Sequence, residues 1–178
     1  MSAIDRALAA NQTFVINYDP NQLSPRPRLK LAVLTCMDTR ISYKSLGLEP
    51  GDAHMIRNAG GIVTDDALRS LLISHYLLGT EEIMIVNHTD CGLTKPSEEE
   101  LRTEIEIKAG FPLNDPVRFY AFRDAAQNVR EQMEKLKSHS WVRQDMVIRG
   151  FVFDVTDGHL REVKQGCAEL AVDTSQES

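Results

Sequence analysis

The sequence predicts a single α/β domain built on a mainly parallel sheet of four or five strands flanked by helices. Short, nearly continuous apolar runs, typical of strands buried on both faces of a parallel sheet, alternate with segments of helical period. The chain has 178 residues, of which 42% are hydrophobic. That length suffices for one well-filled core and is too short for two ordinary domains.

The first 28 residues have little core of their own. We interpret residues 1–28 as a short helix followed by an extended arm, because Pro20, Pro25 and Pro27 interrupt its second half. A segment without a hydrophobic core of its own has to pack its apolar side chains against another surface. We therefore expect it to pack on a partner subunit.

The next part of the chain alternates strands with a helix. Residues 29–35 and 82–87 are apolar runs that we interpret as neighbouring buried strands, and residues 53–57 as a further strand. A helix with acids in its first turn is predicted between an N-cap at Thr64 and a C-cap at Gly79.

The second half predicts two more helices and a hairpin. Repeated acids over residues 98–106 indicate a solvated helix face. An Asp-Pro pair at 115–116 predicts the start of a helix that continues over 117–137 with apolar spacing near the helical period. A strand over 147–155, followed by a Gly-containing turn, predicts a returning hairpin strand over 160–163.

Composition excludes several classes of partner. The net charge of −6 and a pI near 5.4 disfavour binding to nucleic acid or to an anionic membrane, which requires a basic surface. No apolar run approaches the roughly 20 residues that cross a bilayer, and the N-terminus lacks the apolar core of a signal peptide. The sequence therefore predicts a soluble, cytoplasmic protein with a small-molecule substrate.

Three residues form a candidate metal site. Cys36 follows the first predicted strand, and His88 and Cys91 follow its predicted neighbour, at the sheet edge where α/β proteins bind ligands. Two thiolates and one imidazole suit Zn²⁺ and leave a fourth position for water or a carboxylate. The alternative is two buried core thiols and a structural histidine. Cys167 is expected to be a free surface thiol.

Asp38 and Arg40 follow Cys36 at alternating positions, so in an extended stretch they would point the same way as that ligand. A carboxylate paired with a guanidinium stays ionised and oriented, and it could accept a hydrogen bond from metal-bound water. The alternative is a salt bridge at a strand end without a catalytic role. No spacing ties the remaining histidines to the metal, so we assign structural or surface roles to His54, His75, His139 and His159.

Three segments together resemble the signature blocks of β-carbonic anhydrases: Cys36–Arg40 (CMDTR), Arg57–Gly61 (RNAGG) and His88–Gly92 (HTDCG). The resemblance implies the fold of that family, assembly as a homodimer or a dimer of dimers, and one Zn²⁺ per chain held by Cys36, His88 and Cys91. It also implies a catalytic pair of Asp38 and Arg40.

In a closed form, by the same resemblance, Asp38 would be a fourth zinc ligand. Ala59, Gly60 and Gly61 are candidates for the wall of the substrate pocket, where glycine allows close backbone approach. Together with the prolines of the first segment and the polar residues of the last, this predicts an arm (1–28), a zinc-binding catalytic domain (29–164) and a polar, flexible tail (165–178).

The resemblance leaves three functions open. The first is reversible hydration of CO2 to bicarbonate by attack of a metal-bound hydroxide on a small linear substrate. The second is hydrolysis of carbonyl sulfide at the same site, since the branch with an HTDCG block includes such enzymes and Pro27 stands where many members carry a substrate-facing Gln. The third is a non-catalytic zinc protein in which Asp38 permanently closes the fourth position.

Overall fold

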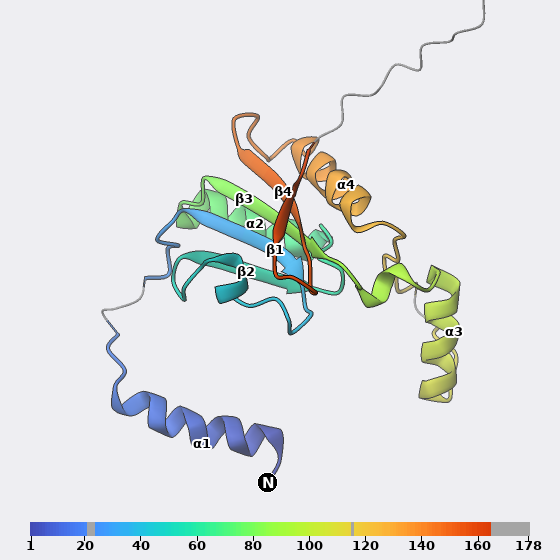
Figure 1. Ribbon diagram of the computed structural model, residues 1–178, viewed down its shortest axis with the longest axis horizontal. Helices are drawn as coiled ribbons and strands as arrows, with labels where there is room; N and C mark the ends of the chain where they lie inside the picture. The colour runs from blue at the N-terminus through green and yellow to red at the C-terminus, as the bar shows by residue number, and fades with distance from the viewer. Residues whose placement is uncertain (21–23, 115, 165–178) are drawn as a thin grey trace, which may run out of the picture.

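A five-stranded sheet forms the centre of the protein, as the computed structural model shows (Figure 1). The structure describes residues 1–20, 24–114 and 116–164. The strand order is β2-β1-β3-β4-β5, and only the pairing of β4 with β5 is antiparallel. The predicted fold class and hairpin are confirmed. The strands are β1 (Leu31–Cys36), β2 (Ala53–Asn58), β3 (Glu82–His88), β4 (Val147–Phe153) and β5 (Leu160–Val163).

Four α-helices accompany the sheet within the described residues, and two 3₁₀ turns lie in the loops. The helix predicted between Thr64 and Gly79 is confirmed: the Thr64 side chain accepts a hydrogen bond from the backbone of Ala67, and Gly79 ends the helix at a φ of 83°. The helices are α1 (Ala3–Ile16), α2 (Asp65–Leu78), α3 (Glu98–Ala109) and α4 (Ala125–Lys137), and the turns are η1 (Lys44–Leu46) and η2 (Gly92–Thr94).

The helix predicted over 117–137 is wrong in its first half. Helix α4 begins only after its N-cap Asp124, and the preceding segment is extended or bent. Tyr120 has a φ of 59°, a left-handed conformation that no α-helix accommodates. The Glu98 carboxylate accepts hydrogen bonds from two backbone N–H groups of this segment. Tertiary partners from α3 therefore take the backbone groups that a helix would pair internally.

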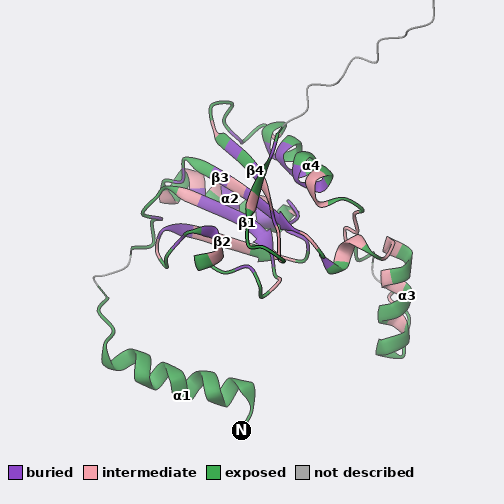
Figure 2. Ribbon diagram, in the orientation of Figure 1, coloured by how far each residue is buried: buried purple, intermediate pink, exposed green. Residues whose placement is uncertain are grey.

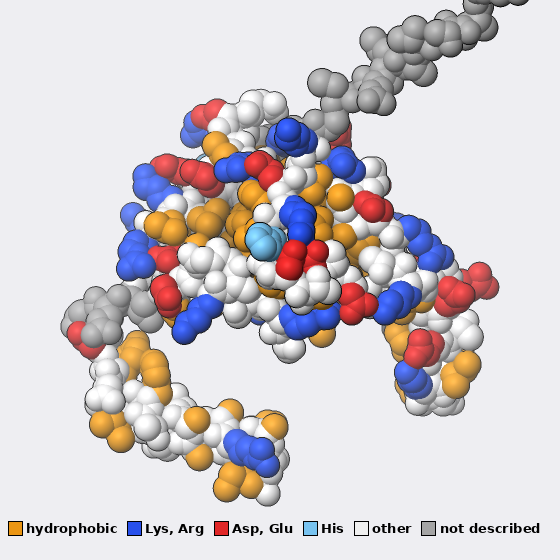
Figure 3. All heavy atoms as spheres, viewed as in Figure 1, with side chains coloured by type: hydrophobic (Ala, Val, Ile, Leu, Met, Phe, Trp, Pro, Cys, Tyr) orange, Lys and Arg blue, Asp and Glu red, His pale blue; other side chains and the backbone are white. Residues whose placement is uncertain are grey.

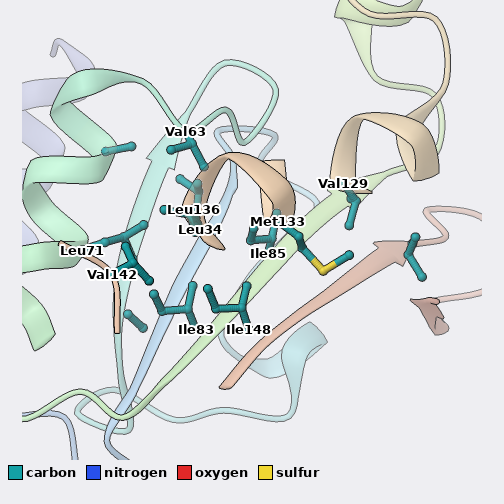
Figure 4. Packing of buried hydrophobic residues seen from close by; sticks show 13 residues of the cluster. Leu34, Val63, Leu71, Ile83, Ile85, Val129, Met133, Leu136, Val142 and Ile148 are labelled. Carbon is teal, nitrogen blue, oxygen red and sulfur yellow. The ribbon is translucent and has the colours of Figure 1, made fainter. Parts of the chain in front are cut away.

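One face of the sheet packs against α2 and α4 (Figure 4). Side chains of β1, β3 and β4 meet Leu71 of α2 and Met133 of α4 there, and each large side chain buried in such a core contributes about 1.5–3 kcal/mol. The opposite face carries a second cluster, covered in part by the loop that contains Ile41, Leu46 and Leu48. Figure 2 shows that burial concentrates in the central strands.

Helix α4 lies unusually close to β4 because Gly150 has no side chain. A Cβ atom at Gly150 would stand 2.2 Å from Cγ1 of Val129 and 2.9 Å from Sδ of Met133. Both residues belong to the buried face of α4. This glycine therefore sets how closely the helix approaches the sheet.

Helices α1 and α3 lie away from the sheet (Figure 1). No residue of α1 is buried, and hydrophobic side chains are exposed along it (Figure 3). Among the described residues, no helix combines the length and apolar character needed to span a bilayer. The cytoplasmic location and the division at residues 28 and 164 stay predictions. Asp115, Cys167 and the predicted tail lie outside the described residues.

Candidate metal centre

The pairing of β1 with β3 brings the candidate ligands together. Cys36 is the last residue of β1 and His88 the last of β3, and the two parallel strands are direct neighbours. Asp90, at a φ of 55°, lies in the turn that carries the chain from His88 to Cys91. The ligand atoms of Cys36, His88 and Cys91 all lie within 4.8 Å of one another, and all three residues are buried. The grouping expected from the sequence is present.

His88 presents an unpaired nitrogen to this cluster. Its Nδ1 lies 2.9 Å from the backbone carbonyl oxygen of Thr89, which can only accept, so Nδ1 carries a proton. Its Nε2 is buried without a hydrogen-bond partner. In the neutral ring that atom is a bare lone pair, and leaving it unpaired costs free energy unless it binds another group.

The two thiols titrate together. The pKa of Cys36 is lowered chiefly because the neighbouring Cys91 thiol can donate a hydrogen bond to the Cys36 thiolate, and the pKa of Cys91 is raised because its ionisation would remove that donor. Burial opposes protonation of His88, but the adjacent Cys36 sulfur raises the pKa of the imidazole overall. The cluster thus favours at least one thiolate, the form of cysteine that binds metals.

Asp38 and Arg40 form the predicted pair, but in a turn rather than an extended stretch. Strand β1 ends at Cys36, and the backbone N–H of Arg40 folds back to donate to Oδ1 of Asp38 at 2.9 Å. The guanidinium donates from Nε to Oδ1 at 2.9 Å and from Nη2 to Oδ2 at 2.7 Å. Arg40 therefore holds the pKa of Asp38 well below its usual range. Oδ2 of Asp38 lies 3.8 Å from Nε2 of His88.

Two residues that sequence reasoning left without a role support this arrangement. Asp90 accepts from Nη1 of Arg40 at 3.3 Å and from Lys95 at 2.9 Å, so Arg40 bridges two carboxylates. Arg57 donates to the backbone carbonyls of Cys36 at 3.2 Å and Asp38 at 2.6 Å. The available signal for Arg57 was its place at the end of the strand predicted over 53–57, and the structure sets it opposite Thr35, the residue before Cys36.

The Gly60–Gly61 segment lies directly beside the cluster. A Cβ atom at Gly61 would stand 3.1 Å from the carbonyl carbon of Thr35 and 3.2 Å from the backbone nitrogen of Cys36. Both glycines are buried and have positive φ, whereas Ala59 is exposed. The close backbone approach expected of these glycines is therefore present.

The remaining histidines lie in other contacts. His54 bonds to Oγ of Ser74 at 2.6 Å and to the Pro25 carbonyl at 2.9 Å, so it ties the arm to the domain. His75 donates to the Thr80 carbonyl at 2.7 Å. His139 accepts from the backbone of Trp141, and the exposed His159 lies 3.2 Å from Asp157. These contacts fit the structural or surface roles expected from the sequence.

The donor set fits a zinc ion. Two sulfurs and one imidazole nitrogen are the ligands that Zn²⁺ prefers, and three protein ligands are typical of catalytic zinc sites. The Nδ1 hydrogen bond of His88 supplies the outer-sphere partner that such a histidine normally has. Residues of this chain can therefore hold the metal.

Comparisons with known proteins agree with this geometry. A family model described as carbonic anhydrase matches residues 31–160. Beta-carbonic anhydrase 1 of Mycobacterium tuberculosis (strain ATCC 25618 / H37Rv) is 38% identical over 165 residues, covering 92% of this chain and 99% of that protein. A carbon disulfide hydrolase of Acidianus sp. (strain A1-3) is 36% identical over 159 residues, covering 76% and 78%.

The fold comparison gives the same result. The crystal structure of a carbonic anhydrase from Streptococcus mutans superimposes with a TM-score of 0.85 at 39% identity, covering 92% of this chain and 99% of that one. The family model spans most of the described domain and includes both strands that carry the cluster. From this agreement of sequence, fold and site, the chain belongs to the β-carbonic anhydrase family of enzymes.

Proposed function

We propose that this protein catalyses the reversible hydration of CO2 to bicarbonate, with one Zn²⁺ per chain held by Cys36, His88 and Cys91. The observation that carries the proposal is the unpaired Nε2 of buried His88, which faces two thiols next to an ionised Asp38. A zinc ion bound there lowers the pKa of a water molecule toward about 7 and so supplies a nucleophile at neutral pH.

Asp38 would orient the attacking water. Because Arg40 keeps Asp38 ionised, the Asp38 carboxylate can only accept hydrogen bonds. It would accept one from the O–H of the water and so orient an oxygen lone pair toward the carbon of CO2. Addition of water to CO2 gives bicarbonate and one proton, which must pass to solvent. Ala59, Gly60 and Gly61 would form part of the pocket wall.

Hydrolysis of a sulfur analogue of CO2 is the second candidate. Carbon disulfide hydrolases are among the relatives that share more than a third of their aligned residues with this chain. Carbonyl sulfide is likewise linear, and its hydrolysis consumes one water and releases CO2 and H2S. One extra small group in a pocket is worth only about 1–3 kcal/mol of discrimination, so the same residues could serve either substrate.

A permanently closed, non-catalytic site is less well supported. Closure would require an oxygen of Asp38 to leave Arg40, and both carboxylate oxygens are engaged by that guanidinium. The pair is further anchored because Asp90 also binds Arg40. These contacts favour an arrangement in which Asp38 stays beside the cluster instead of joining it.

We also propose that the enzyme works as a homodimer or a dimer of dimers. Helix α1 has no buried residue, although Ile4, Leu8 and Val15 recur on one face at helical spacing. An isolated helix of this length is marginal in water. Packing of α1 on a partner subunit would bury that face.

A side-by-side turnover assay tests the function. The zinc-loaded protein is given CO2, carbonyl sulfide and carbon disulfide in one buffer, and proton release and sulfide release are followed. We expect proton release from CO2 to dominate, with a Cys36→Ser variant at background because it loses a ligand. Dominant sulfide release would move the assignment to hydrolysis of a sulfur analogue. Silence with all three substrates would contradict both activities and favour the closed site.

A further inference from the structure

A chain of buried side-chain amides runs behind the metal cluster. The backbone N–H of Val63 donates to Oε1 of Gln132 at 2.9 Å, and Nε2 of Gln132 donates to Oδ1 of Asn128 at 2.9 Å. Nδ2 of Asn128 donates to Oδ1 of Asn87 at 2.6 Å, and Nδ2 of Asn87 donates to the carbonyl of Gly60 at 3.1 Å. The chain thus starts and ends on one short segment, residues 60–63.

The polarity of this chain is set by its two ends. A backbone N–H can only donate and a carbonyl oxygen can only accept, so each amide between Val63 and Gly60 must accept on one side and donate on the other. Flipping any one amide would bring two donors or two acceptors face to face. The three side chains are buried, and an amide turned the wrong way would leave polar atoms without a protein partner in a medium of low polarity.

The chain and the ligands use opposite faces of β3. Successive residues of a strand point to opposite sides, so Asn87 points toward α4 while the adjacent His88 points toward the cluster. Asn128 and Gln132 both belong to α4, which Gly150 allows to lie close to the sheet. These amides therefore connect α4 to the strand that carries His88.

What the chain holds in place is the backbone around Gly60. A Cβ atom at Gly61 would stand 3.2 Å from the backbone nitrogen of Cys36, so the peptide that joins Gly60 to Gly61 lies against the end of β1. The carbonyl of that peptide, which belongs to Gly60, is the acceptor for Asn87. Gly60 has a φ of 83°, so no side chain restricts its backbone and an external contact must fix its orientation.

We infer that Asn87, Asn128 and Gln132 are positioning residues for the metal centre: they orient the Gly60 peptide and hold it against the backbone of Cys36, and so fix the position of that ligand. This inference rests on the proposed zinc site. Outer-sphere groups of this kind tune the affinity and electronic properties of a metal without touching it. The amides act through Gly60 and are not catalytic residues.

The test uses cobalt as a spectroscopic probe. Asn128→Leu keeps the branched shape of the side chain and removes its donor and acceptor, which frees Asn87 to turn. The full-length wild type and variant are loaded with Co²⁺, the thiolate-to-cobalt charge-transfer band is recorded, and affinity is measured by competition with a chelator. We expect the band to shift and Co²⁺ affinity to fall about tenfold, the low end for outer-sphere substitutions.

Two further variants separate positioning from stability. Val129→Ala removes packing from the same helix without touching the amides, so it should lower Tm and leave the band and the affinity as in wild type. Gln132→Met replaces an amide at the far end of the chain with a side chain of similar length. It should shift the band in the same direction as Asn128→Leu, and it serves if that variant does not fold.

The outcomes are distinct for the inference and for the proposed function. A folded Asn128→Leu or Gln132→Met protein with the wild-type band and affinity would overturn the inference, whatever its Tm. A wild-type protein that binds no Co²⁺ would overturn it as well. A wild-type protein that binds Co²⁺ but turns over none of the three substrates would remove the proposed function, and the spectra would still decide the positioning role.

Discussion

Arg40 connects two acidic side chains at the rim of the metal cluster. It binds both oxygens of Asp38 on one side and Oδ2 of Asp90 on the other. A planar guanidinium held by two carboxylates has little freedom to rotate. Asp38 is therefore oriented by a partner that is itself fixed, 3.8 Å from the ligand nitrogen of His88.

Substitution of Asp38 by Ala should reduce kcat/KM for CO2 by about 10–100-fold, because the attacking water loses its acceptor. Zinc content should stay at one ion per chain, because three other residues hold the metal. Stopped-flow hydration and elemental analysis measure the two quantities. The matched control is Asp66→Ala, which breaks an exposed Asp-Arg pair on α2 at 2.8 Å far from the cluster. Equal rates for both variants would exclude the orienting role.

The sequence predicts the grouping of Cys36 with His88 and Cys91 because these residues follow the ends of two apolar runs that are typical of neighbouring strands, and it predicts the Asp38–Arg40 pair from their spacing of two. It could not identify Asn128 as a partner of Asn87, because that contact depends on how α4 packs, 41 residues away along the chain. The turn geometry of Arg40 was missed for a similar reason. The Asp38 side chain accepts a hydrogen bond from the backbone N–H of Arg40, two residues later, and this contact ends the strand locally. The spacing of apolar residues gives no sign of such a turn.

At the level of elements, the strands and α2 were predictable because their patterns and caps agree with their environments. The segment before α4 was not, because its helical periodicity competes with a tertiary contact. The carboxylate of Glu98, which the sequence placed on a solvated face, binds the backbone of Phe119 and Ala121 instead. Local pattern specifies an element only where no distant side chain takes its backbone groups.

Gly150→Ala should destabilise the protein by about 1–3 kcal/mol, the usual cost of overpacking a filled core. The added methyl group would overlap Cγ1 of Val129, and the backbone of α4 would have to move outward. Denaturant titration measures the change in free energy of unfolding. Gly158→Ala is no suitable control because Gly158 has a positive φ, whereas Gly92→Ala adds a methyl group with no atom within 4 Å. A Gly150→Ala protein as stable as Gly92→Ala would contradict close packing at β4.

For the whole molecule, the exposed helix α1 bears on assembly. Leu8→Glu places a charge on the face that carries Ile4, and Thr13→Glu places the same charge on the opposite face. We expect Leu8→Glu to shift the mass measured by light scattering toward the monomer at micromolar concentration, and Thr13→Glu to leave it unchanged. Neither should unfold the domain, because α1 buries no residue within it. A wild type that is already monomeric would refute the assembly.

The central strand pairing has a further consequence, for the order of events in folding. Thr35 of β1 and Val86 of β3 bond to each other although 51 residues separate them, so Cys36 and His88 cannot meet until this long-range parallel pairing has formed. Such contacts are slow to form because a long loop must close first. Metal capture would then follow the rate-limiting step. A bound ion would prolong the lifetime of the native state by slowing its unfolding, and it would leave the speed of folding nearly unchanged.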